Sequence, residues 1–235
     1  MRVKLVAGLV IAAVVIAAVL FQISKARCFQ LVGDVTCRVE TDRKIVALSF
    51  DDGPTPEGVD AVLPVLDQFG AKATFFLIGD RIEKYPGQAE RLLEAGHELG
   101  NHTYSHQRNL MKSREFYRNE VRRADELLLA ADAQTKLFRP PFGKRLIGLP
   151  LEVEAAGYRT VTWDVEDNPE MFEGDAAGYA QDILARVEPG SIILIHPMYR
   201  HNQTARDALP LILSGLSERG YTIVTVGELL ESADE

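Results

Sequence analysis

The chain lacks the features that mark several large protein classes. Its 235 residues contain 26 Lys and Arg against 34 Asp and Glu, and no run of basic residues occurs. The resulting net charge of -8 argues against nucleic acid as a partner. No glycine-rich phosphate loop precedes an expected helix, which disfavours phosphoryl transfer, and neither a long linker nor a second domain is apparent. What remains is 46% hydrophobic residues, enough to bury the core of one α/β domain.

One long apolar run stands near the N-terminus. It extends from Leu5 to Phe21 and follows Arg2 and Lys4. Its length lies at the lower edge of a membrane-spanning helix and above an ordinary signal-peptide core, and no convincing small-x-small cleavage site follows. We expect residues 1–24 to form an uncleaved signal anchor, with a cleaved signal peptide as the alternative. The remainder would then lie in the cell envelope: it would be anchored in the cytoplasmic membrane with the catalytic domain outside, or secreted if the N-terminal segment is cleaved.

The chain has only two cysteines, and they flank a short alternating segment. Cys28 and Cys37 enclose "FQLVGDVT", in which Gly33 and Asp34 form a turn signal. We expect a β-hairpin and lead-in over residues 25–42. In an oxidising compartment the two cysteines would form a disulfide, whereas two free thiols would fit a cytoplasmic protein.

From Lys44 onward, short β-rich runs alternate with amphipathic helical patterns. Residues 113–133, for example, carry an apolar stripe at helical spacing. Strand, helix, strand at this spacing indicates parallel strands, and seven of them favour a distorted barrel over an open sheet. We therefore expect one α/β domain over residues 43–235. The expected strands are 44–50, 72–79, 97–102, 137–141, 158–163, 191–196 and 221–226.

Polar residues stand at the ends of five of these strands. The first ends in the adjacent carboxylates Asp51 and Asp52, and the others run into "NHTYSH", "FRPPFG", "TWDVED" and "ILIHP". Barrels of this kind carry their chemistry at the carboxyl ends of the strands, so these residues would meet at one mouth. Because side chains alternate between the faces of a strand, two neighbouring carboxylates at the end of a buried strand indicate a functional pair.

Two histidines are spaced to share a metal ion. His102 and His106 are four residues apart, so on a helical turn both imidazoles would lie on one face. Asp52 would complete a set of two histidines and one aspartate with open positions. Non-haem iron oxygenases use the same set, but no cosubstrate site is evident and the paired aspartates fit hydrolysis better. The ligand types alone permit several divalent ions; we expect one ion, zinc, with cobalt or nickel as alternatives.

Three further residues could act on protons. Asp51 could take a proton from a water whose pKa a neighbouring ion lowers. A buried arginine would orient such a base, and Arg139 is the candidate. His196, at the end of a very apolar run, would be the general acid. The structural alternatives are an ordinary ion pair for Arg139 and a core histidine for His196.

Five motifs together resemble a known family. They are "SFDDGP" (49–54), "HTYSH" (102–106), "RPPFG" (139–143), "TWDVED" (162–167) and "LIHP" (194–197). Their residues and order resemble the polysaccharide deacetylase family, the NodB-homology domain of carbohydrate esterase family 4, over roughly residues 44–230. The resemblance implies a distorted (β/α)7-type barrel and metal-dependent hydrolysis of an N-acetyl group on an amino sugar, with release of acetate.

The resemblance also implies a role for each of nine residues. The catalytic group is the base Asp51, the arginine that orients it, Arg139, and the acid His196. The metal ligands are Asp52, His102 and His106. The substrate-binding group is the backbone N–H of Phe142, which would stabilise the oxyanion, and the acetyl-pocket walls Trp163 and Leu194.

The fourth motif departs from the family pattern. Many members have an Asp-Trp pair several residues beyond the position of Trp163, and its aspartate tunes the acid histidine. This chain reads "WDVEDNPEMFEGD" and has no downstream tryptophan. Asp164, Glu166 and Asp167 are all candidates for the partner of His196.

We therefore expect a deacetylase of polymers or oligomers that contain N-acetylglucosamine, with peptidoglycan or another envelope glycan favoured over chitin. The expected partners are this acetylated glycan and, through the N-terminal helix, the membrane; no nucleic acid or protein partner is expected. The alternative is a catalytically inactive glycan-binding or assembly protein on the same fold, which the altered fourth motif would support.

Overall fold

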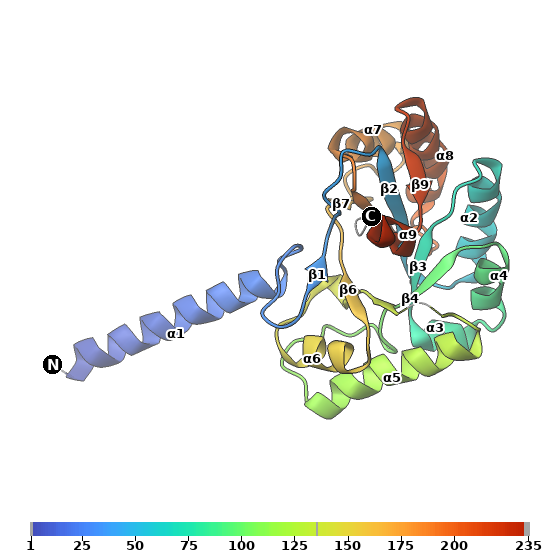
Figure 1. Ribbon diagram of the computed structural model, residues 1–235. Helices are drawn as coiled ribbons and strands as arrows, with labels where there is room; N and C mark the ends of the chain where they lie inside the picture. The colour runs from blue at the N-terminus through green and yellow to red at the C-terminus, as the bar shows by residue number, and fades with distance from the viewer. Residues whose placement is uncertain (1, 135, 233–235) are drawn as a thin grey trace.

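The computed structural model describes residues 2–134 and 136–232 (Figure 1). The helices are α1 (Arg2–Ser24), α2 (Pro56–Gln68), α3 (Gly79–Lys84), α4 (Gln88–Glu94), α5 (Arg114–Ala130), α6 (Gly148–Ala155), α7 (Ala176–Arg186), α8 (Gln203–Glu218) and α9 (Val226–Glu231), with a 3-10 turn at Pro141–Gly143. The strands are β1 (Val35–Thr36), β2 (Ile45–Gly53), β3 (Thr74–Leu77), β4 (Glu98–Asn101), β5 (Leu137–Phe138), β6 (Arg159–Val161), β7 (Val165–Glu166), β8 (Ile192–Ile195) and β9 (Thr222–Val224).

The nine strands form one parallel sheet that curves into a distorted half-barrel, as expected from the sequence. The strand order is β1-β6-β5-β4-β3-β2-β8-β7, and β9 pairs with the first residues of β2. The two edges of the curved sheet approach each other just after β1. There Arg38 forms an isolated β-bridge with Ser191, the residue before β8. Seven strands correspond to the expected ones; β7 was not expected, and β1 lies in the segment where a hairpin was expected.

Alternate residues of the central strand β2 enter two different apolar cores. Val46, Leu48 and Phe50 pack outward against the surrounding helices α2, α4, α7 and α8. Ile45 and Ala47 face the inside of the half-barrel, where α9 also packs. Because β2 is buried along its whole length, its run of apolar residues reads as continuous rather than alternating.

Several helices begin at polar caps that the sequence places directly after a strand or loop. Thr55 accepts a hydrogen bond from the backbone of Gly58 at the start of α2, and Ser113 does the same for Phe116 at the start of α5. These caps fix the direction in which the chain leaves the mouth of the half-barrel. As a result, the loops that precede the helices hold the polar strand ends together.

The N-terminal helix stands apart from the domain. Figure 1 shows α1 as an isolated stalk that leaves the molecule near β1 and α6. Lys4–Ser24 is long and apolar enough to cross a membrane, and none of its most apolar window is buried. This agrees with an anchor or a signal peptide.

The segment between the two cysteines differs from the expected hairpin. A disulfide joins Cys28 and Cys37, with 5.1 Å between their Cα atoms. However, β1 pairs in parallel with β6 and not with a neighbouring strand of its own segment. The hairpin prediction was therefore wrong, because β6 offers a free sheet edge that the alternating residues after the Gly33 turn can join.

Candidate active site

A bulge in β2 brings both aspartates to the mouth of the half-barrel. Asp51 is four residues after Ala47, so in an alternating strand both side chains face the interior. An unbroken strand would turn Asp52 outward, on the same side as Phe50. The pairing of β2 with β3 shifts between Asp51 and Gly53, and Asp52 takes a left-handed φ of 68°. Both carboxylates consequently reach one residue: Asp51 Oδ2 lies 3.7 Å and Asp52 Oδ1 3.5 Å from His102 Nε2.

The two histidines converge from a loop and not from a helix. His102 directly follows β4, and the segment to His106 is irregular, with φ of 64° at Thr103 and 52° at His106. The Thr103 hydroxyl accepts from the backbone of His106, and Asn101 accepts from that of Thr103. The helical turn expected from the spacing was therefore wrong, although the shared site was expected correctly. A tight loop meets the same geometric need.

The atoms of Asp52, His102 and His106 suit a metal ion. Their ligand atoms lie within 4.8 Å of one another, and His106 Nε2 is 2.9 Å from Asp52 Oδ1. His102 Nδ1 lies 2.8 Å from the carbonyl oxygen of Arg139, which can only accept, so Nδ1 carries the proton and Nε2 presents a lone pair. A lone pair that faces a buried carboxylate oxygen calls for a cation between them.

Asp52 has the charge that a metal ligand needs. Burial opposes its ionisation, yet the neighbouring His102 and His106 outweigh burial and hold the pKa of Asp52 well below its ordinary value. Its Oδ1 atom is buried and makes no hydrogen bond of good geometry to the described residues. The residues present therefore fit one divalent cation.

Arg139 holds Asp51 in place from the inside of the half-barrel. Its Nη1 donates to Asp51 Oδ1 at 2.8 Å and to Ser49 Oγ at 2.9 Å, and its side chain is fully buried. The guanidinium also lies over the ring of Phe76, with 4.0 Å to the ring centre. Burial lowers the pKa of Arg139, and the charge of Asp51 opposes this change. The ion pair between Arg139 and Asp51 engages Oδ1 and leaves Asp51 Oδ2 free to face Asp52, His102 and His106.

The structure selects one of the three candidate partners of His196. Asp167 Oδ1 lies 2.7 Å from His196 Nδ1, while its Oδ2 accepts from the backbone of His196 and from the hydroxyl of Tyr179. Burial would lower the pKa of His196, but Asp167, followed by the charges of Asp51 and Asp52, raises it to about 9. His196 therefore carries a proton at neutral pH, with Nε2 3.9 Å from Asp52 Oδ2.

The other two candidates have structural partners. Asp164 accepts from the Ser191 hydroxyl and from the backbone of Ile192, and Glu166 pairs with Arg27 at 2.6 Å. The spacing in the sequence could not separate the three, because the turn at β7 decides which carboxylate faces His196.

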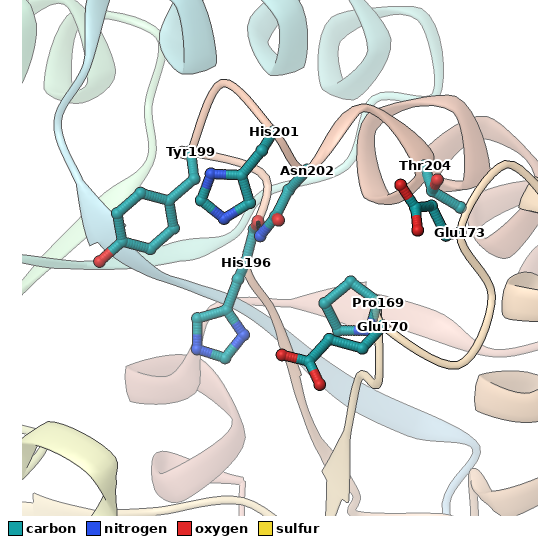
Figure 2. A pocket seen from close by; sticks show the side chains of 8 residues that line it. All are labelled: Pro169, Glu170, Glu173, His196, Tyr199, His201, Asn202 and Thr204. Atoms are coloured by element: carbon teal, nitrogen blue, oxygen red, sulfur yellow. Dashed lines mark hydrogen bonds between the residues drawn. The ribbon is translucent and has the colours of Figure 1, made fainter.

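A cavity of about 370 Å³ opens beside His196. Figure 2 shows His196 and Tyr199 on one side of it and Glu173 and Thr204 on the other. Tyr199 was not expected from the sequence. Burial and then the nearby charge of Asp52 raise the pKa of the Tyr199 hydroxyl. No motif signals Tyr199, since it lies on an irregular turn after β8.

The three substrate-binding residues expected from the resemblance lie around the same mouth. Phe142 has a left-handed φ of 56° and is 50% exposed, and its ring packs against that of His106 at a tilt of 44°, with 4.7 Å between ring centres. Trp163 and Leu194 are buried and belong to one apolar cluster inside the half-barrel. Four of the six described non-glycine residues with positive φ lie at this mouth, namely Asp52, Thr103, His106 and Phe142. Such strain is typical of functional sites.

Comparison with known proteins identifies relatives of this arrangement. The family model described as polysaccharide deacetylase matches residues 38–161. A peptidoglycan-N-acetylglucosamine deacetylase of Bacillus cereus is 34% identical over 199 residues, covering 84% of this chain and 93% of the relative. The peptidoglycan-N-acetylmuramic acid deacetylase PdaC of Bacillus subtilis is 31% identical, covering 82% of this chain and 40% of the relative.

Solved structures of similar fold come from the same family as the relatives found by sequence. The Bc1960 peptidoglycan N-acetylglucosamine deacetylase superposes with a TM-score of 0.78 at 32% identity, covering 83% of this chain and 92% of that one. BA3943 from Bacillus anthracis, described as a pseudoenzyme of carbohydrate esterase family 4, superposes with a TM-score of 0.77 at 25% identity, covering 85% and 70%. The chain therefore belongs to the polysaccharide deacetylase family of hydrolases.

Proposed function

We propose that this protein removes N-acetyl groups from N-acetylglucosamine units of peptidoglycan and releases acetate. The observation that carries the proposal is the pairing of a buried, arginine-bound Asp51 with the Asp52, His102 and His106 cluster. Support for the substrate comes from relatives that are named for peptidoglycan deacetylation. Within the chain, residues 43–235 would form the catalytic domain.

Asp52, His102 and His106 would hold one divalent ion, with zinc favoured and cobalt or nickel as alternatives. Such an ion supplies Lewis-acid polarisation of the amide carbonyl and lowers the pKa of a nearby water. Asp51 acts as base and takes a proton from that water as its oxygen attacks the acetyl carbon. Arg139 holds the carboxylate of Asp51 so that its free oxygen faces Asp52, His102 and His106.

Breakdown of the amide requires a proton on the departing nitrogen. His196 supplies it, because Asp167 keeps its imidazole protonated and fixed through Nδ1. The C–N bond then breaks, and the products are acetate and the free amine of the sugar. The backbone N–H of Phe142 stabilises the negative oxygen that forms on the acetyl carbon, and Trp163 and Leu194 enclose the acetyl methyl group.

The apolar helix α1 would keep the protein in the cytoplasmic membrane with the catalytic domain outside. Its length and its complete exposure support this arrangement, and a disulfide between Cys28 and Cys37 suits an oxidising compartment. Cleavage after the helix, which would release a secreted enzyme, is the alternative.

A second candidate function is glycan binding without catalysis. It is favoured by one observation, the similarity in fold to the pseudoenzyme BA3943. Against it, this chain keeps both aspartates, both histidines, the arginine and a protonated His196 at one mouth.

Acetate release by the full-length protein in detergent tests the proposal. Chelation is expected to abolish release from peptidoglycan fragments, and zinc or cobalt to restore it, with chitooligosaccharides as the parallel substrate. Asp51→Asn should lower kcat by about 100-fold to 10,000-fold while it still binds one metal ion. Asp80→Asn, an exposed aspartate of α3, is the matched control and should change neither quantity. Metal binding without acetate release by the unaltered protein would favour the glycan-binding alternative.

A further inference from the structure

The end of α1 is firmly joined to the rim of the active site. Ser24 is fully buried, and its carbonyl oxygen accepts from the backbone of Arg145 at 3.0 Å. Arg145 is itself buried, and its Nη2 donates to the carbonyl oxygens of Ala26, Arg27 and Phe29. Hydrogen bonds therefore join the last turn of the apolar helix to the loop that carries Phe142.

Large apolar side chains are exposed next to this joint. Phe29 is 53% exposed, Leu31 39%, Ile147 50% and Leu151 43%. Ile147 lies three residues after Lys144, and Leu151 one helical turn further on the same side of α6. Arg145 Nε donates to Gln30 Oε1, which ties the segment with Phe29 and Leu31 to the same loop. We call these four residues the joint face.

Three basic side chains near the last turn of α1 and Phe142 have no acidic partner among the described residues. The ammonium group of Lys144 lies 4.7 Å from the ring centre of Phe21, in the last turn of α1, and Lys25 lies 5.3 Å from the same ring. Arg108 lies over Phe142 at 5.3 Å. Burial and then the charges of Lys25 and Arg108 lower the pKa of Lys144, which agrees with their closeness. In a chain with a net charge of -8, such a group of unpaired cations is distinctive.

We propose that the joint face, with Lys25, Lys144 and Arg108, rests on the surface of the membrane that α1 spans. The apolar side chains would enter the headgroup region, and the cations would meet lipid phosphates. The apolar helix ends at Ser24, and Lys144 lies against Phe21 in its last turn. The membrane surface would therefore lie at the depth of Lys144. This inference rests on the proposed membrane anchor.

Contact with the membrane would also limit which glycan strands the active site can reach. Phe142 joins the two regions, since its ring contacts both His106, at 4.7 Å between ring centres, and the guanidinium of Arg108, at 5.3 Å. One edge of the active site is then held at the bilayer. Glycan strands that run close to the membrane would be the accessible substrate, and distant layers of the wall would not be.

Spin labels on the full-length protein in nanodiscs of phosphatidylglycerol and phosphatidylethanolamine test the surface. The native cysteines are joined in a disulfide, so each introduced cysteine is the single free thiol. The label at Ile147→Cys should collide several-fold more with oxygen, relative to a water-soluble nickel chelate, than the label at Leu211→Cys. Leu211 is a matched control, 45% exposed and on α8. The label at Val14→Cys, in the middle of α1, reports whether the helix spans.

The outcomes distinguish contact of the joint face with the membrane from anchoring by α1. If position 14 is in lipid while position 147 behaves like position 211, the joint face does not contact the membrane and the proposal fails, whereas the anchor stands. If position 14 is in water, both fail. Lys25→Glu with Lys144→Glu should return position 147 to the value of position 211, while Lys84→Glu, an exposed lysine of α3, should not. An unchanged value at position 147 in the double variant would overturn the role of the cations.

Discussion

At the scale of single residues, the site depends on a few side chains whose protons are placed by hydrogen bonds. Asp167 uses both of its oxygens, one on the ring of His196 and one shared by the backbone of His196 and Tyr179. The same carboxylate thus fixes the position of His196, the proposed acid, and raises its pKa. Catalysis should depend on Asp167 although it does not touch the substrate.

Replacing Asp167 should weaken the general acid and change its pH dependence. Since Asp167 raises the pKa of His196, Asp167→Asn should lower that pKa, so the protonated acid is lost at lower pH. The alkaline limb of kcat is expected to move to lower pH, and kcat at neutral pH to fall by about 10-fold to 100-fold. Initial rates of acetate release between pH 5 and 10 measure both effects.

Glu166 offers the matched control one residue away. Its carboxylate pairs with Arg27 and not with His196, so Glu166→Gln should leave the pH profile in place. A profile that shifts equally in both variants would show that Asp167 has no special role.

At the scale of structural elements, the loop from Phe142 to Arg145 connects catalysis with the segment after α1. Arg145 donates to the carbonyl oxygen of Gly143 within the loop and to three carbonyl oxygens outside it. No carboxylate pairs with its guanidinium among the described residues, and burial lowers its pKa to about 10. Carbonyl dipoles alone compensate this buried charge.

Replacing Arg145 should loosen the joint. Arg145→Met removes the donors to the carbonyl oxygens of Gly143, Ala26 and Phe29, and we expect the free energy of unfolding to fall by about 2 to 4 kcal/mol. Urea denaturation followed by circular dichroism measures the loss, and limited proteolysis between residues 24 and 37 shows where the chain opens.

A neighbouring arginine separates this effect from a general loss of charge. Arg159, on β6, is exposed, so Arg159→Met should change the free energy of unfolding by less than about 0.5 kcal/mol. Equal losses in the two variants would contradict the special position of Arg145.

At the scale of the whole molecule, a buried histidine makes stability depend on pH. His97 lies between β3 and β4, where its Nδ1 accepts from the backbone of Ala73 and its ring packs on Phe75. Burial and then the charge of Lys72 lower its pKa from 6.5 to about 4. Its imidazole is therefore neutral in the folded protein at pH 7.

The sign of this effect follows from proton binding. Between pH 6.5 and 4 the unfolded chain binds a proton at His97 that the folded protein does not bind, so the free energy of unfolding falls as pH falls through this window. The loss should be about 2 to 3 kcal/mol. His97→Asn should flatten this part of the curve when urea denaturation of the metal-free protein is compared at pH 7, 5.5 and 4. His201→Asn, at an exposed loop position, should leave the slope unchanged.

The sequence by itself determined the parallel α/β rhythm and the identity of the residues that meet at the mouth. Strands such as 191–196 and motifs such as "HTYSH" are local patterns, and parallel strands bring their carboxyl ends to one edge whatever the loops do. For this reason the cluster of Asp52, His102 and His106 could be expected before any geometry was known.

Only the tertiary structure decided how those residues reach one another. The bulge that turns Asp52 inward depends on the register between β2 and β3, and the pairing of β1 with β6 depends on an edge more than 100 residues away in the chain. The choice of Asp167 over its neighbours depends on the path of the turn at β7. These features arise from contacts between distant segments. Periodicity and spacing along the chain contain no information about such contacts.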